Sequence, residues 1–270
     1  NSLTTIGYKA FSECESLTGT LHIPLSVTII YGQAFSYCKN ISAIKLHPGI
    51  QLSGYGFFDH CSSLTELTIP EGWETTGKSS FSNCSSLTKV SLPESLKTIG
   101  NGCFMNCVNL SEINLPQGVT SIGIEAFSHC VNLFLGELVL PNTVERIEAF
   151  ALDSCIGITR IIIGESINFI AGPAFSNTRL EAMVIKATTP PELKYIVNQS
   201  YLPLDLPIFV PCGTLETYQN AEGWSNFTNL HEGLMVVLSV ASSDETTGTV
   251  FVLKEATCED DTVLVEAVPN

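Results

Sequence analysis

The chain has 270 residues, of which 44% are hydrophobic and 14% are charged, and its 27 acidic and 12 basic residues give a net charge of −15. This acidity argues against binding to nucleic acid, whose phosphates need a basic surface, and against docking on anionic lipid. No stretch has the length and apolar character of a membrane-spanning helix, so we expect no direct membrane insertion by this chain.

A sequence repeat of about 23 residues starts with the first residues and runs to position 185. Residues 3–7 already match residues 96–100, so the pattern starts without a polar first unit. We therefore expect the natural N-terminus, with any signal or anchor, to lie upstream. Repetition at this period is typical of a solenoid, in which each unit buries its apolar edge against its neighbours. We predict a repeat solenoid, mainly β, with about eight rungs over residues 1–185.

The copy that contains Pro93 shows the expected structure of one rung. Val90 and Leu92 alternate with polar residues, as in a half-buried strand. Pro93 ends this strand because proline has no N–H to donate to the ladder. Residues 96–104 lack the apolar stripe of a helix, so we expect an extended return with turns and short 3₁₀ pieces on the outer side.

Alignment of the copies gives two columns of core residues. The aromatic position holds Phe11, Phe35, Phe58, Phe81, Phe104, Phe127, Leu152 and Phe175. Three residues later, seven copies have a cysteine: Cys14, Cys38, Cys61, Cys84, Cys107, Cys130 and Cys155. Neighbouring rungs place these side chains in parallel, ~4.8 Å apart, whereas a disulfide needs Cβ atoms about 3.8 Å apart. A column of small buried thiols is therefore favoured over a disulfide framework.

The repeat that follows Cys130 is longer because it contains two additional residues, Phe134 and Leu135. Beyond them the usual spacing returns, which assigns Leu152 to the core aromatic position and Phe150 to an outward one. Apolar residues exposed by an insertion often mark an interface, but we favour local repacking.

The outward positions of the predicted strands form two columns on one open surface, which we call the strand face. The first column is Thr20, Ala43, Glu66, Lys89, Glu112, Glu137, Arg160 and Ala182, and the second is His22, Lys45, Thr68, Ser91, Asn114, Val139, Ile162 and Val184. The face is mixed in charge at first and becomes apolar at its C-terminal end. Contiguous exposed apolar surface usually indicates a contact, here with a ligand or with the C-terminal segment folded back. The candidate ligand contacts are Glu66, Lys89, Glu112, Asn114, Glu137, Val139, Arg160, Ile162 and Val184.

Residues 186–232 are predicted to form a C-terminal capping region. Residues 208–210 have the composition of a last strand, and residues 214–221 that of a short helix. The side chains expected to face or close the end of the core are Leu215, Tyr218, Trp224 and Phe227.

Residues 233–270 are predicted to form a small β module, which is either truncated or leans on the solenoid. Apolar patterns predict strands over 235–241, 249–253 and 262–268. The acidic turn at 259–261 is a weak candidate for a Ca²⁺ site.

The string L-x-x-[IL]-x-[LI]-P, followed by I-G-x-x-A-F-x-x-C, recurs in register over residues 1–185. It closely resembles the BspA-like leucine-rich repeats of bacterial surface proteins. The resemblance implies a secreted or cell-surface adhesion or ligand-binding module, with no chemistry of its own and no cofactor. Its partner would be a protein or a glycan, for example one of a host organism. We expect the chain to be a monomer.

The sequence gives little support to an enzyme or a metal site. The five histidines lie on different rungs, and the P-loop, HExxH, GxSxG and Rossmann patterns are missing. Cys103 fills a small-residue position rather than forming a zinc site with Cys107. We expect the polar residues that precede the cysteine column to hydrogen-bond the turn backbone. Two functions stay open: an adhesion module that uses the strand face, and a structural spacer that carries another domain.

Overall fold

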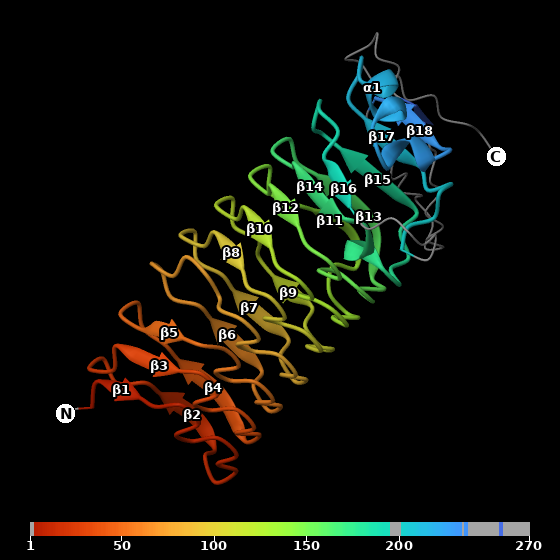
Figure 1. Ribbon diagram of the computed structural model, residues 1–270. Helices are drawn as coiled ribbons and strands as arrows, with labels where there is room; N and C mark the ends of the chain where they lie inside the picture. Colours follow the sequence, from red (N-terminus) through yellow and green to blue (C-terminus); the bar gives the residue numbers. More distant parts are fainter. Residues whose placement is uncertain (1–2, 195–200, 234, 237–253, 256–270) are drawn as a thin grey trace, which may run out of the picture.

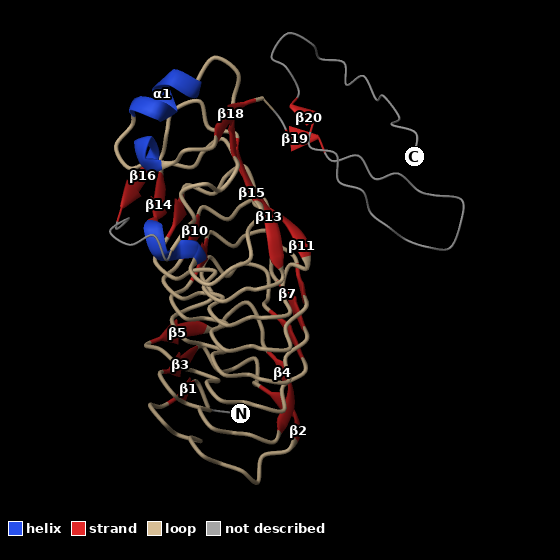
Figure 2. Ribbon diagram, turned by 90° about the vertical axis from the view of Figure 1, so that its right-hand side faces the viewer, coloured by secondary structure: helices blue, strands red, loops and turns tan. Residues whose placement is uncertain are grey.

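The computed structural model describes residues 3–194, 201–233, 235–236 and 254–255. The chain forms an elongated stack of turns that ends at a small cap (Figure 1). Each turn contributes a strand to one side of the stack and, in most turns, a second strand to the opposite side, so that two rows of parallel strands enclose the core (Figure 2). This is the solenoid that the repeat predicts.

The strand face consists of two five-stranded parallel sheets. The first contains β2 (Gly19–His22), β4 (Ile41–Lys45), β6 (Glu66–Thr68), β7 (Lys89–Ser91) and β9 (Glu112–Ile113). The second contains β11 (Gly136–Val139), β13 (Ile158–Ile163), β15 (Ala182–Ile185), β17 (Ile208–Val210) and β18 (Leu230–Glu232). Eight of these strands lie within residues 1–185, as the repeat predicts. β17 and β18 continue the ladder into the capping region, so this side has ten strands among the described residues.

The opposite row, the return row, is also parallel. It begins with β1 (Thr5–Ile6), β3 (Ile29–Tyr31) and β5 (Gln51–Ser53). It continues with β8 (Thr98–Ile99), β10 (Ser121–Ile122), β12 (Arg146–Ile147), β14 (Phe169–Ala171) and β16 (Glu192–Lys194). Turns connect the two rows, with one 3₁₀ helix, η1 (Gly172–Phe175), among the described residues of the repeats.

The core is built from the two predicted columns. The phenylalanine rings from Phe11 to Phe127 stack nearly in parallel, with centroids 5.2–6.0 Å apart. Each cysteine from Cys38 to Cys155 donates its thiol to the carbonyl oxygen of the aromatic residue one turn before, at 2.9–3.4 Å. The seven thiols of the column are free, as predicted. Cys14 is only partly buried, because it belongs to the first turn and has a neighbour on one side.

The insertion acts locally. It separates β9 from β11, which belong to different sheets, while the return row runs unbroken from β8 to β16. Phe134 adopts φ = 55° and packs edge-on against Phe127, with ring centroids 6.0 Å apart. Leu152 fills the aromatic column with 1% exposure, and the half-buried Phe150 lies against Tyr201. The predicted register is confirmed. Local repacking holds for Phe134, whereas Leu135, the second inserted residue, is 75% exposed.

The residue before each cysteine position has a left-handed backbone. Its φ lies between 55° and 62° in all eight turns, at Glu13, Tyr37, His60, Asn83, Asn106, His129, Ser154 and Asn177. Its N–H then donates to the next turn, as in Asn106 N to Ser128 O at 2.8 Å. We predicted that these side chains would bind the turn backbone, but their hydrogen bonds go to other side chains. Asn106 Nδ2 donates to Asn83 Oδ1 at 3.0 Å, and Asn83 and Asn177 donate to the carboxylates of Asp59 and Asp153.

The cap closes the core as expected. Helix α1 (Leu215–Asn220) and the 3₁₀ helix η2 (Trp224–Asn226) cover the last turns. Tyr218, Trp224 and Phe227 are buried, and Leu215 packs partly against the core. The Tyr218 hydroxyl donates to Ala187 O at 2.8 Å, so the buried ring leaves no unpaired polar atom.

Beyond the cap, β19 (Met235–Val236) pairs antiparallel with β20 (Lys254–Glu255). β19 lies within the first strand predicted for the C-terminal module, and β20 lies just after the second. The third predicted strand, at 262–268, and the acidic turn at 259–261 lie outside the described residues.

Candidate functional site

The first column of the strand face is a row of alternating charges. Parallel pairing places Glu66, Lys89 and Glu112 side by side on β6, β7 and β9. Lys89 Nζ lies 3.0 Å from Glu112 Oε2, and both side chains are more than half exposed. The hydrogen bond and the charge of Glu112 raise the pKa of Lys89. In the second sheet Arg160 Nη2 lies 3.3 Å from Glu137 Oε2.

One polar residue of the second column, Asn114, hydrogen-bonds the strand ladder itself. Asn114 is exposed and lies just beyond the short strand β9. Its amide nitrogen donates to Leu92 O at 3.0 Å, and its amide oxygen accepts from Leu92 N at 2.9 Å. Asn114 therefore extends the strand pairing where the backbone no longer does, and part of its hydrogen-bonding capacity is occupied.

The apolar end of the face is less open than predicted. Val139 is 54% exposed, Ile162 is partly buried, and Val184 is only 5% exposed. Val184 forms a cluster with Ala182 and Phe209, against which Ile162 packs. The prediction that Val184 is open to a ligand is wrong, because β17 adds Phe209 beside it in register. Arg160 is also largely covered, with 20% of its side chain exposed.

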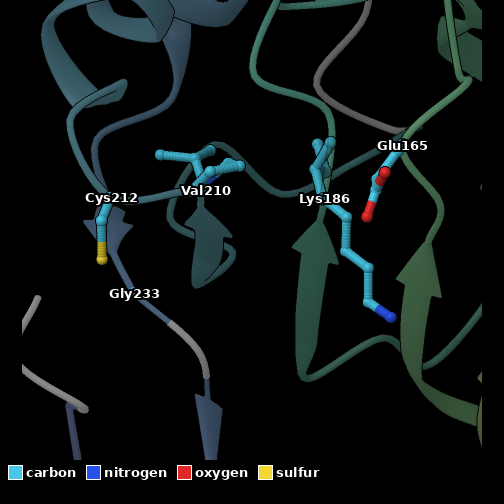
Figure 3. Close-up of a pocket in the computed structure, with 7 residues that line it drawn as sticks. Glu165, Lys186, Val210, Cys212 and Gly233 are labelled. Atoms are coloured by element: carbon cyan, nitrogen blue, oxygen red, sulfur yellow. The ribbon is translucent and has the colours of Figure 1, made fainter. Parts of the chain in front are cut away.

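A cavity of about 380 Å³ lies where β13, β15, β17 and β18 end. Figure 3 shows Cys212 and Gly233 on one side and Glu165 and Lys186 on the other. The cavity thus offers one ammonium and one carboxylate. Cys212 is disulfide-bonded, so its sulfur is not a nucleophile.

One cluster has the composition of a hydrolytic triad but not its geometry. Ser128 Oγ lies 2.9 Å from His129 Nδ1 and 3.2 Å from Asp153 Oδ2. In a triad the imidazole bridges the serine and the carboxylate through its two nitrogens. Here the serine bridges, and the imidazole turns the same nitrogen towards both groups, at 3.6 Å from the carboxylate. Ser128 is also buried, with 4% exposure, so its hydroxyl is not presented to a substrate.

The described part of the chain contains no group of three or more histidine, cysteine or acidic residues arranged to hold a metal ion. Among these residues no helix has the length and apolar character needed to cross a bilayer, and the α-helix has only six residues.

The profile of the BspA type leucine rich repeat region matches residues 4–134 and 132–202, in six copies. These matches cover well over half of the sequence. The chain belongs to the BspA-type leucine-rich repeat family. No curated protein matches it significantly.

Two solved leucine-rich repeat proteins match the fold of this chain at a TM-score of 0.50 or more. A leucine-rich repeat protein of T. pallidum is 30% identical, with a TM-score of 0.50 over 66% of this chain and 71% of that one. A leucine-rich repeat protein of Eubacterium ventriosum is 24% identical, with a TM-score of 0.51 over 61% of this chain and 44% of that one. A leucine-rich cell surface protein of Faecalibacterium prausnitzii is 21% identical, with a TM-score of 0.45 over 73% of this chain and 72% of that one.

Two carboxylates of this BspA-type chain, the buried Asp153 and the partly buried Asp59, were not predicted from the sequence. Asp59 and Asp153 directly follow the aromatic position, which is followed by serine in most other copies. Each accepts from a serine and an asparagine of the next turn or the one before, as in Asn177 Nδ2 to Asp153 Oδ1 at 2.8 Å. The sequence does mark these two residues, because each is acidic at a repeat position where most copies have serine.

Asp153→Ala is expected to lower the free energy of unfolding by about 1–3 kcal/mol, because Ser128, Ser154 and Asn177 lose their acceptor. Urea denaturation of both proteins measures the change. Asp205→Ala, at an exposed position, is the control and is expected to have little effect. Equal effects of the two substitutions would contradict a structural role for the buried carboxylate.

Proposed function

We propose that this chain is a non-catalytic cell-surface or extracellular module that binds a protein or glycan through the open part of its strand face. The supporting observation is the exposed charged row at Glu66, Lys89, Glu112 and Glu137, which ends at the exposed Val139. These side chains stand on rigid parallel strands, so they keep a fixed spacing. Charged residues are usual in the rim of a protein-binding surface, around a more apolar centre.

The bonded Cys212 supports a location outside the reducing cytosol. The geometry of the Ser128 cluster and the bonded state of Cys212 favour binding over chemistry. Solenoids commonly bind partners through an extended surface whose exposed residues vary on a constant core. The strand face is a surface of this kind.

The test is a screen of the purified protein against extracellular matrix proteins and a glycan array, followed by variants of the face. Val139→Asp and Lys89→Glu are expected to weaken binding at least about tenfold if they lie at the centre of the contact. Ile124→Asp is the matched control, because Ile124 is similarly exposed, at 42%, but follows β10 in the return row.

Binding that all three variants retain would move the ligand site away from the strand face. The absence of any binder in the screen would favour the alternative function, a spacer whose stacked turns hold another domain at a distance.

A further inference from the structure

Three exposed tyrosines lie on the first three turns, in the return row opposite the strand face. Tyr8 follows β1, Tyr31 ends β3 and Tyr55 follows β5, so each of these turns contributes one ring (Figure 2). Their exposed fractions are 59%, 39% and 47%. Tyr31 and Tyr55 belong to turns with a neighbouring turn on each side, so their exposure does not depend on the end of the stack. We call these three residues the tyrosine group.

The second turn connects the members of the tyrosine group. The Tyr8 hydroxyl donates to Gln33 Oε1 at 2.7 Å, and Gln33 N donates to Tyr55 O at 2.8 Å. Gly32, which lies between Tyr31 and Gln33, packs directly on the backbone of the third turn, since a Cβ at Gly32 would lie only 3.0 Å from Tyr55 O. Glycine therefore keeps the two turns in backbone contact and places no side chain between the rings.

The tyrosine group is surrounded by hydroxyl and amide groups rather than by other apolar side chains. The exposed residues of β1 and β5 include Thr5, Gln51 and Ser53. In the described part of the chain, none of the three rings stacks on another aromatic ring. A protein interface usually packs such rings into an apolar centre. A sugar instead places its C–H groups on the electron-rich face of a ring and its hydroxyls against polar neighbours, so this surface fits a sugar better than a protein.

The charge around the tyrosine group differs from that of the rest of the chain. Residues 1–58 contain two of the 27 acidic residues and three of the 12 basic ones. The exposed Lys9 places its Nζ 5.5 Å from the centre of the Tyr8 ring, and the exposed Lys78 pairs with Tyr55 through an isolated β-bridge. Neither lysine forms an ion pair with an acidic residue that the structure describes. This surface is complementary to an anion, which the acidic remainder of the chain repels.

We propose that the tyrosine group binds a glycan that carries carboxylate groups, such as a chain of uronic acids. Its sugar rings stack on Tyr31 and Tyr55, and its carboxylates pair with Lys9 and Lys78. Successive turns are ~4.8 Å apart, so the glycan lies along the stack and contacts one ring per turn. The site goes beyond the proposed function, because it lies in the return row and does not use the strand face.

Calorimetric titration with oligosaccharides tests the class of ligand. Hyaluronan and polygalacturonate oligosaccharides, which carry carboxylates, are expected to bind, and added salt is expected to weaken this binding. Chitin oligosaccharides, which are neutral, are expected to bind at least about tenfold more weakly, because they leave both lysines without a partner. If neither carboxylated probe bound, or if the neutral probe bound equally well, the proposal would be overturned.

Substitutions locate the site. Tyr55→Ala is expected to weaken binding of the carboxylated probes at least about tenfold, whereas Tyr55→Phe keeps the ring and is expected to bind like the wild type. Ile124→Ala is the matched control, because Ile124 occupies the same repeat position three turns further along and is similarly exposed. Because these side chains are exposed, all three variants are expected to retain the thermal unfolding temperature of the wild type.

The strand face is tested separately with Lys89→Glu, which is expected to leave the binding of these glycans unchanged. A loss of glycan binding in Lys89→Glu but not in Tyr55→Ala would assign the glycan to the strand face and overturn the proposal. So would a matrix protein that still binds after its glycans are removed and is lost in Tyr55→Ala, since the tyrosine group would then be a protein-binding surface.

Discussion

Between pH 8 and pH 10 the free energy of unfolding is expected to fall by on the order of 10 kcal/mol, because the core column is built from thiols that ionise only when the chain unfolds. Burial raises the pKa of Cys61, Cys84, Cys103, Cys107, Cys130 and Cys155, to about 12 for Cys103 and for Cys155. In the unfolded chain the same thiols have an ordinary pKa of about 8.5.

The sign follows from the protons bound in each state. Below about pH 8 both states keep these thiols protonated, and the stability they contribute is fully present. Above that pH the unfolded chain releases protons that the folded chain retains, so stability falls by about 1.4 kcal/mol per thiol and pH unit until the folded pKa is reached. Six thiols together give about 8 kcal/mol per pH unit, which is comparable with the whole stability of a domain. We therefore expect alkaline unfolding near pH 10.

Urea denaturation at several pH values, with a reductant present, measures this dependence. Cys103→Ala is the matched variant, since alanine occupies the equivalent position in five other turns and fits the fold. With one thiol fewer, the fall of the unfolding free energy with pH is expected to be smaller by about 1.4 kcal/mol per pH unit. Stability that stays constant up to pH 10, or an unchanged pH dependence in Cys103→Ala, would mean that the buried thiols do not ionise on unfolding.

The core could be predicted because a repeat provides its own alignment. A single copy does not tell whether Phe150 or Leu152 is buried, but seven other copies fix the register. The left-handed positions were missed for the opposite reason. Residues as different as Glu13, Tyr37 and Asn83 share φ near 60°, and the shared backbone is imposed by stacking on neighbouring turns rather than by residue type.

The candidate site was predicted less well, because exposure depends on residues outside the repeat. The register placed Val184 outward, and the structure agrees, but β17 adds Phe209 beside it and so removes it from solvent. The spacing of residues 186–232 is irregular, so β17 and β18 could not be assigned to the stack by alignment. The open part of the face, from Glu66 to Val139, lies within regular repeats, and there the predicted exposure holds.

Phe104→Ala is expected to lower the free energy of unfolding by about 3–5 kcal/mol, because it empties a ring-sized space in a core that cannot collapse around it. The ring is fully buried and lies between those of Phe81 and Phe127, at centroid distances of 6.0 and 5.7 Å. The N–H of Phe104 donates to Ala126 O in the next turn at 2.9 Å. The neighbouring turns therefore cannot move inward without breaking this hydrogen bond.

Two further variants separate cavity formation from loss of the aromatic ring. Phe104→Leu is expected to cost less than half as much as the alanine variant, about 1–1.5 kcal/mol, since Leu152 already fills the same column in another turn. Phe11→Ala is expected to cost less as well, because Phe11 is 39% exposed and stacks on one ring only. Urea denaturation of the three variants measures how much unfolding free energy each substitution costs. If Phe11→Ala were as damaging as Phe104→Ala, the stability of a turn would not come from the burial of its aromatic residue between two neighbouring turns.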